Sequence, residues 1–261
     1  MMRVTVNGVL TDTDSKTIGE LGHRLYPDRG IAVADGRQVP ADTILEEGMT
    51  IYFGEGKDMR AAMLKRDDPD VESHISGACV GIAGLGGLGS NIAAMLARTG
   101  VGRLVIADFD CVDLSNLNRQ NYFVKDLGLA KTDATEKILK RMSPFTEIEK
   151  HTVRLTPENI PGIFGMCDVV CEAFDAADQK AMIVSTMMER LPDIPLVSGS
   201  GMAGAGDANS ITTKTVLGHV VLCGDGKEDG NIPPHLMAPR VNVCAGHMAN
   251  AVIRILTDKK D

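Results

Sequence analysis

The chain has 261 residues, of which 44% are hydrophobic, and its formal net charge is −8 at pH 7. A chain of this length has room for one large domain and a smaller one. The acidic balance argues against a broad nucleic-acid-binding surface, so no nucleic-acid partner is expected and any cationic site must be local.

Residues 1–56 are predicted to form a small domain. Their pattern is strand, strand, helix, strand, strand, in which a two-residue turn joins the first two strands and a hydroxyl side chain caps the helix. The helix has one apolar face. In chain order, these features are a strand at residues 4–6, the turn Asn7-Gly8, the cap Ser15, the apolar face Ile18, Leu21 and Leu25, and strands at residues 30–34 and 49–53.

Residues 57–76 follow as a connector that is rich in charge. The sequence predicts one short helix in this connector, at residues 59–65. The alternative interpretation is a solvated spacer.

From residue 77 onward, strands and helices alternate. This alternation predicts an α/β domain with a mostly parallel sheet, right-handed crossovers and helices on both faces. Strands are predicted at residues 79–83, 104–107, 150–155, 168–172 and 196–198, and helices at residues 88–99, 131–142 and 177–190. An antiparallel pair at residues 210–216 and 218–223 and a helix at residues 243–256 complete the domain. The glycine run at residues 199–207 is compatible with a flexible loop or with a tight turn.

A glycine-rich turn follows the first strand of this domain. Its glycines let the backbone approach a phosphate without a Cβ in the way, and the next helix aims its free N–H groups at an anion. Asp108 ends the following strand, about twenty residues beyond the glycines, where Rossmann-like folds hydrogen-bond a ribose hydroxyl. The alternative is a turn that packs a helix closely on a strand. The glycines are Gly84, Gly86, Gly87 and Gly89.

Residues 75–97 carry no charge and are long enough to span a bilayer. Six glycines and Asn91 make this stretch a poor membrane segment, and its periodicity changes midway. We therefore expect no membrane partner.

A polar cluster follows the ribose acid. Asn116, Arg119 and Gln120 come first, and Lys131 opens the next predicted helix. A lysine in a first turn lies at the unfavourable end of the helix dipole unless an anion binds there, and a polyphosphate would remove that conflict. The cluster therefore favours a nucleoside triphosphate over a nicotinamide. Taken singly, Asn116 could be a turn former, and Arg119 and Lys131 surface charges.

Asp175 lies just beyond a predicted strand, at the carboxyl edge of the sheet where open α/β folds bind ligands. An acid there can hold Mg²⁺, which bridges phosphate oxygens and offsets their charge. The alternative role for Asp175 is to cap the helix at residues 177–190.

These motifs together resemble the nucleotide site of the ubiquitin-activating-enzyme superfamily, and in particular the ThiF/MoeB-type adenylyltransferases. The resemblance covers nearly everything after about Met63, and the amino-terminal unit is similar to ThiS, a β-grasp protein. The motifs are GLGGLG at Gly84, D-F-D at Asp108, SNLNRQ at Ser115, the lysine of GLAK and the aspartate of EAFDAAD. The implied nucleotide contacts are Gly84, Gly86, Gly87, Gly89, Asp108, Asp110, Ser115, Asn116, Arg119, Gln120, Lys131 and Asp175.

The resemblance implies a reaction in which the terminal glycine carboxylate of a ThiS-like sulfur carrier attacks the α-phosphate of MgATP, in thiamine thiazole biosynthesis. That carboxylate has a pKa of about 3.5 and is ionised at neutral pH, so catalysis reduces to alignment and charge neutralisation. The residues implied for this work are Arg119, Lys131, Asn116 and an Mg²⁺ ion on Asp175. Relatives also insert an arginine from a partner subunit, which implies a homodimer. Arg66 is the best positional match for that arginine, with Arg60 in reserve.

The cysteines mark where the chain departs from its relatives. Many relatives bind zinc with two C-x-x-C pairs, but the six cysteines here form no such pair, so we expect no zinc. Scattered thiols, together with an amino terminus that lacks the apolar core of a signal peptide, favour the cytoplasm. Cys223 is the candidate for sulfur chemistry in the later loop, although a core position is the simpler interpretation. Cys244 is expected to pack in the core.

The ThiS-like unit departs from free carriers because it continues through GEGK at Gly54. Without a terminal carboxylate it cannot be the substrate. Three alternatives to the leading interpretation stay open: the same chemistry on another carrier or small carboxylate, an NAD-dependent oxidoreductase, and a non-catalytic interaction protein.

Overall fold

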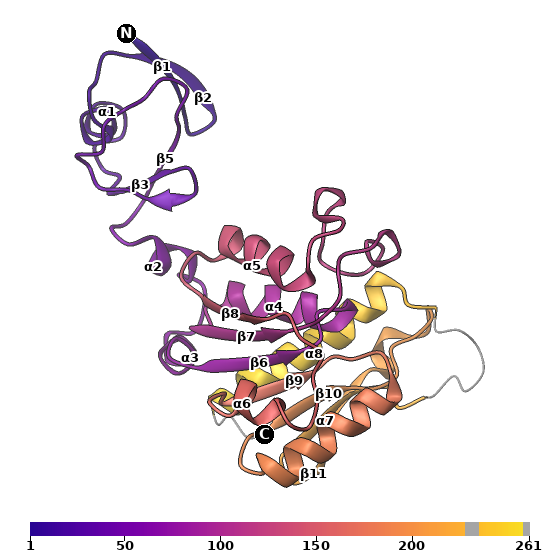
Figure 1. Cartoon of the computed structure of the whole chain (residues 1–261). Helices are drawn as coiled ribbons and strands as arrows, with labels where there is room; N and C mark the ends of the chain where they lie inside the picture. Colours follow the sequence, from indigo (N-terminus) through magenta and orange to yellow (C-terminus); the bar gives the residue numbers. More distant parts are fainter. Residues whose placement is uncertain (228–234, 258–261) are drawn as a thin grey trace. The chain divides into compact units, whose positions relative to one another are not determined.

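A computed structural model describes residues 1–227 and 235–257 of the chain (Figure 1). The chain divides into two compact units, Met1–Asp67 and Asp68–Asp261, which are described separately.

The first unit contains a five-stranded sheet with the order β2-β1-β5-β3-β4. The neighbours β1 and β5 are parallel, whereas β1 pairs with β2 and β3 pairs with β5 in antiparallel fashion. Alternate strand residues point to one helix and form the core with it, including Val4, Ile18, Leu21 and Ile51. The elements are β1 (Met2–Val6), β2 (Val9–Thr13), α1 (Ile18–Leu25), β3 (Ile31–Ala34), β4 (Arg37–Gln38), β5 (Thr50–Gly54) and α2 (Met59–Met63).

The predicted cap of α1 is wrong by two residues. Thr17, not Ser15, occupies the N-cap position, and its hydroxyl accepts a hydrogen bond from the backbone N–H of Glu20 at 3.2 Å. Ser15 is instead buried beside Thr13, whose Oγ1 accepts its backbone N–H. Ser15 and Thr17 both have a hydroxyl that could cap the helix. Thr17 is the cap because it lies three positions before Glu20, which is the spacing of a capping box.

The stretch predicted as a connector contains two helices. The first, α2, agrees with the predicted short helix but ends two residues earlier, at Met63. The second, α3 (Pro69–Ile75), was not predicted. It begins with Asp68 at the N-cap, whose side chain accepts from the N–H of Asp70, and with proline in the first turn, which is a standard helix start. The boundary between the two units falls between these helices.

The second unit contains a seven-stranded sheet with the order β11-β12-β10-β9-β6-β7-β8. All neighbouring strands are parallel except the edge pair β11 and β12, which confirms the predicted mostly parallel sheet with an antiparallel addition. The strands are β6 (Cys79–Ala83), β7 (Arg103–Ala107), β8 (Glu147–His151), β9 (Val169–Glu172), β10 (Leu196–Gly199), β11 (Thr212–Leu217) and β12 (Val220–Gly224).

Helices cover both faces of this sheet, as predicted (Figure 1). On one face α4 packs against α5 and α8, with Ile92, Leu96 and Met248 in a shared core. On the other face α6 packs against α7, around Phe164 and Ile183. The helices are α4 (Gly87–Thr99), α5 (Lys131–Met142), α6 (Ile160–Phe164), α7 (Ala177–Arg190) and α8 (Ala238–Leu256).

Some predicted boundaries in the second unit are wrong. The strand predicted at residues 150–155 lies earlier, as β8, because this edge strand alternates charged side chains instead of presenting an apolar run. Glu147 and Glu149 flank Arg103 there, and Lys150 pairs with acids of α5. The last helix begins five residues before the predicted position 243, with a proline in its first turn, and the short helix α6 was not predicted.

The uncharged stretch at residues 75–97 is divided between the end of α3, strand β6 and most of α4. Among residues 1–227 and 235–257, no helix is long and apolar enough to cross a bilayer.

Replacing Gly89 by alanine is expected to destabilise the second unit. A Cβ at Gly89 would overlap the carbonyl oxygen of Gly84, so the glycine turn and α4 would have to move apart. Such overpacking typically lowers the free energy of unfolding by about 1–3 kcal/mol. Urea denaturation measures the change.

Gly246→Ala is the matched control, because a Cβ at this helical position meets no atom within 4 Å. That variant should gain up to about 1 kcal/mol from helix propensity. Equal stability of Gly89→Ala and the wild type would contradict the close approach of the two glycines.

Candidate nucleotide-binding cavity

A cavity of about 670 Å³ lies in the second unit at the carboxyl ends of the parallel strands. The loops that follow β6, β7, β9 and β10 all contribute to its lining. It brings together most of the residues that the sequence proposed for a nucleotide site: Gly84, Gly86, Gly87, Asp108, Asp110, Asn116, Arg119, Gln120, Lys131 and Asp175.

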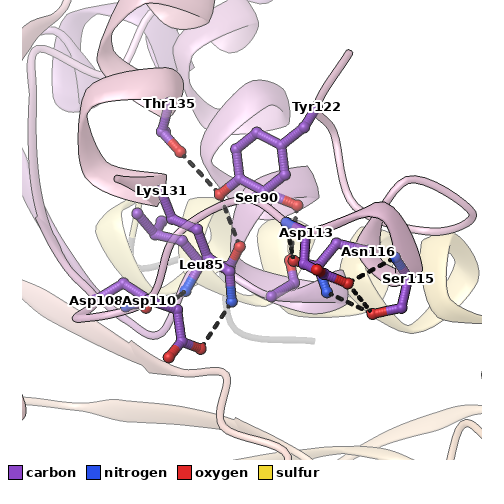
Figure 2. Close-up of polar contacts among 11 residues, drawn as sticks. Leu85, Ser90, Asp108, Asp110, Asp113, Ser115, Asn116, Tyr122, Lys131 and Thr135 are labelled. Atoms are coloured by element: carbon purple, nitrogen blue, oxygen red, sulfur yellow. Dashed lines mark hydrogen bonds and ion pairs between the residues drawn. The ribbon is translucent and has the colours of Figure 1, made fainter. Parts of the chain in front are cut away.

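Three side chains form hydrogen bonds with the backbone of the glycine turn (Figure 2). Gly84 has φ +90°, a conformation that favours glycine. Asp108 accepts the backbone N–H of Leu85 at 2.6 Å, and the Tyr122 hydroxyl donates to the Leu85 carbonyl at 2.8 Å. Ser90 donates to the Gly86 carbonyl at 2.6 Å. These hydrogen bonds hold the backbone of the turn in its observed conformation without a ligand.

Asp108 is a buried carboxylate at the end of β7. Each of its oxygens accepts one backbone N–H, from Leu85 and from Asp110 at 2.8 Å. Burial raises the pKa of Asp108, and the nearby charge of Lys131 partly offsets that rise. Because a carboxylate offers about four acceptor positions, lone pairs are left for a hydroxyl donor in the cavity.

Lys131 opens α5 and is buried, with 7% of its side chain exposed. Its Nζ pairs with Asp110 Oδ2 at 3.0 Å, and its backbone N–H donates to the Asp110 carbonyl at 2.9 Å (Figure 2). Because its side chain is buried, Lys131 is not the simple surface charge that the sequence left open as an alternative. Lys131 therefore places a positive charge beside the N-terminus of α5 at the cavity wall. An anion there would be stabilised both by this charge and by the helix dipole.

The SNLNRQ segment forms a short 3₁₀ turn, η1 (Leu114–Asn116). The Asp113 carboxylate accepts from the backbone N–H and the hydroxyl of Ser115 at 2.9 and 2.7 Å, which lowers the pKa of Asp113 (Figure 2). Asn116 closes the turn by accepting the N–H of Asp113 at 3.0 Å. Asn116 is thus a turn former that also lines the cavity, whereas Ser115 does not line it.

Two buried polar atoms of this segment have no hydrogen-bond partner within the described residues: Arg119 Nε and Gln120 Oε1. Both side chains line the cavity, and Arg119 is anchored by Nη1, which donates to the Ser115 carbonyl at 2.9 Å. An unpaired buried polar atom typically destabilises a protein by about 1–3 kcal/mol. A ligand with an oxygen acceptor and a hydrogen-bond donor would satisfy both atoms.

Asp175 lies exposed at the cavity, in the turn between β9 and α7. The N-cap of α7 is Ala176, without a side-chain cap, so the alternative role of Asp175 as helix cap is not observed. In the described part of the chain, its carboxylate pairs with no other side chain. There, no cluster of three or more His, Cys, Asp or Glu side chains forms a metal site either, so a cation at Asp175 would need ligands from a substrate or from water.

The remaining proposed residues lie elsewhere. Gly89 packs against Gly84 inside α4 and does not line the cavity. Arg66 and Arg60 belong to the first unit, so their insertion into a nucleotide site stays a prediction.

The structure adds residues that the sequence did not single out. The Arg154 guanidinium stacks over the Phe109 ring at 4.1 Å, and both residues line the cavity beside Asp108. Phe109 stood between the two acids of the D-F-D motif, but nothing in the sequence indicated its pairing with Arg154. Lys180 also lines the cavity and pairs with Glu172, which is fully buried at the end of β9.

The cysteines are free thiols in the described residues. Cys223 and Cys244 are buried between α8 and the sheet, as expected for core positions. Burial raises the pKa of the Cys223 thiol and raises that of Cys244 to about 12. Both therefore stay protonated near neutral pH, and a protonated thiol is a poor nucleophile.

Comparison with curated proteins finds relatives that match about half of the chain. A protein of Thermus thermophilus named sulfur carrier protein adenylyltransferase is 35% identical over 142 residues, which are 54% of this chain and 52% of that protein. A protein of Anopheles gambiae named adenylyltransferase and sulfurtransferase MOCS3 is 36% identical over 48% of this chain and 28% of its own length. The chain thus spans about half the length of the first relative and less of the second.

Solved structures share the fold. The E. coli tRNA N6-threonylcarbamoyladenosine dehydratase TcdA, in complex with ATP, superimposes with a TM-score of 0.69 over 76% of this chain and 93% of that chain, at 19% identity. E. coli MccB, solved with ATP, gives a TM-score of 0.59 over 74% and 60% of the two chains, at 20% identity.

Comparison with protein families matches residues 59–261, well over half of the sequence, to the ThiF family. The match covers the glycine turn, the SNLNRQ segment, Lys131 and Asp175, which together line the cavity. The chain therefore belongs to the ThiF family.

Proposed function

We propose that the chain is an adenylyltransferase that uses MgATP to activate the C-terminal glycine carboxylate of a ThiS-like sulfur carrier in thiamine thiazole biosynthesis. The observation that carries the proposal is the polar content of the cavity. Within the described residues, Arg119 Nε and Gln120 Oε1 are buried without hydrogen-bond partners, in side chains that line the same cavity as the buried cation Lys131 and the glycine turn. A nucleoside triphosphate offers the anionic oxygens and the hydroxyl donors that these groups lack.

The cavity suits ATP in size and in the order of its parts. Its volume of about 670 Å³ lies within the usual range for small-molecule sites. The lone pairs of Asp108 suit a ribose hydroxyl, and the adjacent Phe109 and Arg154 offer a flat surface for a purine ring. The N-terminus of α4 behind Gly84 and Gly86 suits a phosphate.

Asp175 is the proposed protein ligand of Mg²⁺. Its free carboxylate at the cavity edge fits an ion that takes one or two carboxylates and completes its shell with phosphate oxygens and water. When bound, the ion would neutralise charge on the polyphosphate.

The proposed chemistry needs little proton transfer. A carboxylate oxygen of the carrier forms a bond to the α-phosphorus of ATP, the bond from that phosphorus to the bridging oxygen breaks, and pyrophosphate leaves with the electron pair. Two anions must approach one another for this to happen. Arg119, Lys131 and Asn116 lower that barrier by binding the phosphate oxygens and aligning the reacting atoms.

Names among the relatives support the choice of acceptor. The Thermus thermophilus relative is named for a sulfur carrier protein, and the Anopheles gambiae relative combines adenylyl and sulfur transfer in its name. Activation of a different carrier or of a small carboxylate is the nearest alternative. TcdA and MccB, which were solved with ATP, share the fold but are not named for a sulfur carrier.

We also propose that residues 1–56 are a ThiS-like β-grasp domain, residues 57–76 a connector and residues 77–261 the catalytic domain. The five-stranded sheet with parallel β1 and β5 packed on α1 supports the first assignment. The chain runs on from Gly54 into α2, and Gln38 bonds both the Lys57 carbonyl and the Met59 N–H at 2.9 and 2.8 Å. This domain therefore lacks the free carboxylate of a substrate. In a homodimer, Arg66 of a second copy would complete the site.

Carrier-dependent exchange of radiolabelled pyrophosphate into ATP tests the function. Exchange is expected only with a ThiS-type carrier that ends in Gly-Gly, because the reverse reaction needs the acyl adenylate. A carrier shortened by its last residue is the control. The absence of exchange with every intact carrier, or stabilisation of the protein against heat by NADH but not by MgATP, would remove the proposal.

Lys131→Met should weaken ATP binding about 10- to 100-fold, since a charge-assisted hydrogen bond contributes about 1.5–3 kcal/mol. Adenosine affinity should change little, because adenosine carries no phosphate. Isothermal titration calorimetry measures both. Lys140→Met is the matched control, since it removes an exposed lysine of the same helix that pairs with Glu136. Equal losses for ATP and adenosine would contradict a phosphate-binding role.

Asp175→Ala should lower the exchange rate at least about 10²-fold, as is usual when one charge-stabilising group is lost. The free energy of unfolding should not fall, because the side chain is exposed and does not cap α7. Asp178→Ala removes another exposed acid of the same turn region and should leave exchange unchanged. Normal exchange by the Asp175 variant would refute the magnesium assignment.

A further inference from the structure

An ion pair between the fully buried Glu172 and the partly exposed Lys180 lies at the wall of the cavity. Glu172, the last residue of β9, has an exposed fraction of 0%. Its Oε1 accepts from the Phe174 N–H at 2.7 Å and from Lys180 Nζ at 2.9 Å. Its Oε2 accepts from Lys180 Nζ at 3.0 Å and from the Ser198 hydroxyl at 2.5 Å. The carboxylate is thus saturated by donors from the ends of two strands and from one helix.

Lys180 uses all of its hydrogen-bond donors in this network. Its ammonium group has three N–H bonds, and its acceptors are the two oxygens of Glu172 and the Gly199 carbonyl at 2.8 Å. It therefore differs from Lys131, which has one side-chain partner. Although Lys180 lines the cavity, it has no N–H left for a phosphate and serves as a tie between β9, α7 and β10.

The tie holds one wall of the cavity, which we call the second wall: residues 173–177 and 199–203. The first part of this wall carries Asp175, and Glu172 fixes it through the Phe174 N–H. The second part is fixed through the Gly199 carbonyl. Asp108, Arg119 and Lys131, which are proposed to bind the nucleotide, also line the cavity, and within the described residues they make no hydrogen bond to this network.

The second part of the wall is irregular backbone held by the loop that follows β12. Within residues 199–207, which the sequence left open as a flexible loop or a tight turn, only Gly204 and Ala205 form a turn. Ser200 donates its N–H to the Cys223 carbonyl at 2.8 Å, and the Gly201 carbonyl accepts the Asp225 N–H at 3.0 Å. Gly201 has φ +77°, and a Cβ there would overlap the Asp225 carboxylate, which is held by the buried Arg240. The segment at residues 199–203 is anchored on one side by Lys180 and on the other by this second ion pair.

We propose that Lys180 is a positioning residue for acyl transfer: through Glu172 it fixes the second wall, which receives the acyl substrate and aligns it with the phosphorus. This inference rests on the proposed function. A buried ion pair is usually no more stabilising than apolar residues of similar volume, so stability alone does not account for it. Its partners place it where a small displacement moves Asp175 and the segment at residues 199–203 together.

The decisive variant is Lys180→Met, compared with Lys180→Arg and with the Lys140→Met control. Carrier-dependent pyrophosphate exchange at saturating ATP should fall about 10²-fold in the methionine variant, the usual result of a misplacement of about 1 Å. Adenosine affinity should change little, because Asp108, which is proposed to bind the ribose, makes no hydrogen bond to this network within the described residues. Lys180→Arg, which keeps the charge and reach, should recover part of the rate.

Hydrogen–deuterium exchange supplies a readout that a loss of activity alone does not. In Lys180→Met, amides at residues 173–177 and 199–203 should exchange faster, while those of the glycine turn at residues 84–89 should not. The double variant Glu172→Gln with Lys180→Met removes the unpaired buried charge and keeps the experiment informative if the single variant does not fold. It should show the same faster exchange and the same loss of rate.

The outcomes separate the two proposals. An inactive wild-type protein overturns the proposed function and this inference with it. An active wild type whose methionine variants keep their rate, lose adenosine affinity in proportion to rate, or show unchanged amide exchange in the second wall overturns this inference alone.

Discussion

The order in which the chain crosses the sheet is the constraint on which the whole site depends. The central strand β6 is followed by β7 and β8 on one side, but the chain then returns to place β9 on the other side of β6. Loops that follow β6 and β9 therefore diverge, and a crevice opens between their carboxyl ends. The glycine turn and Asp175 come from those two loops, and this is why residues almost ninety positions apart line one cavity.

Within that crevice, the partners of each cation decide what it is free to do. The protein is acidic overall, with a net charge of −8. Each of the two lysines that line the cavity pairs with a carboxylate. Lys180 is saturated by a buried carboxylate and a carbonyl, and it acts on the shape of the site. Lys131 has a partner, Asp110, whose side chain is half exposed, so an arriving anion can compete for it. Two lysines in one cavity thus have different functions because their acceptors differ in number and burial.

The parts of the structure that depend on local sequence could be predicted. The bounds of α5 and α7 agree with the predicted helices, and the glycine turn and Asp108 lie where their spacing indicated. The bounds of the charged edge strand β8 could not be predicted, because an exposed strand does not need an apolar run. The Glu172 network could not be found either, because Glu172 and Ser198 become neighbours only through the register of β9 with β10. The unpaired atoms of Arg119 and Gln120 likewise follow from burial, which no motif encodes.

The charges of β8 have a consequence for how copies of the protein can meet. An edge strand exposes unpaired backbone groups that invite another chain to extend the sheet. Here Glu147 and Glu149 are held across the edge by Arg103, and Lys150 by acids of α5, so they stand fixed along the outermost strand. A second β8 would bring the same ordered charges against themselves. Charged side chains fixed in this way disfavour extension of the sheet through this edge.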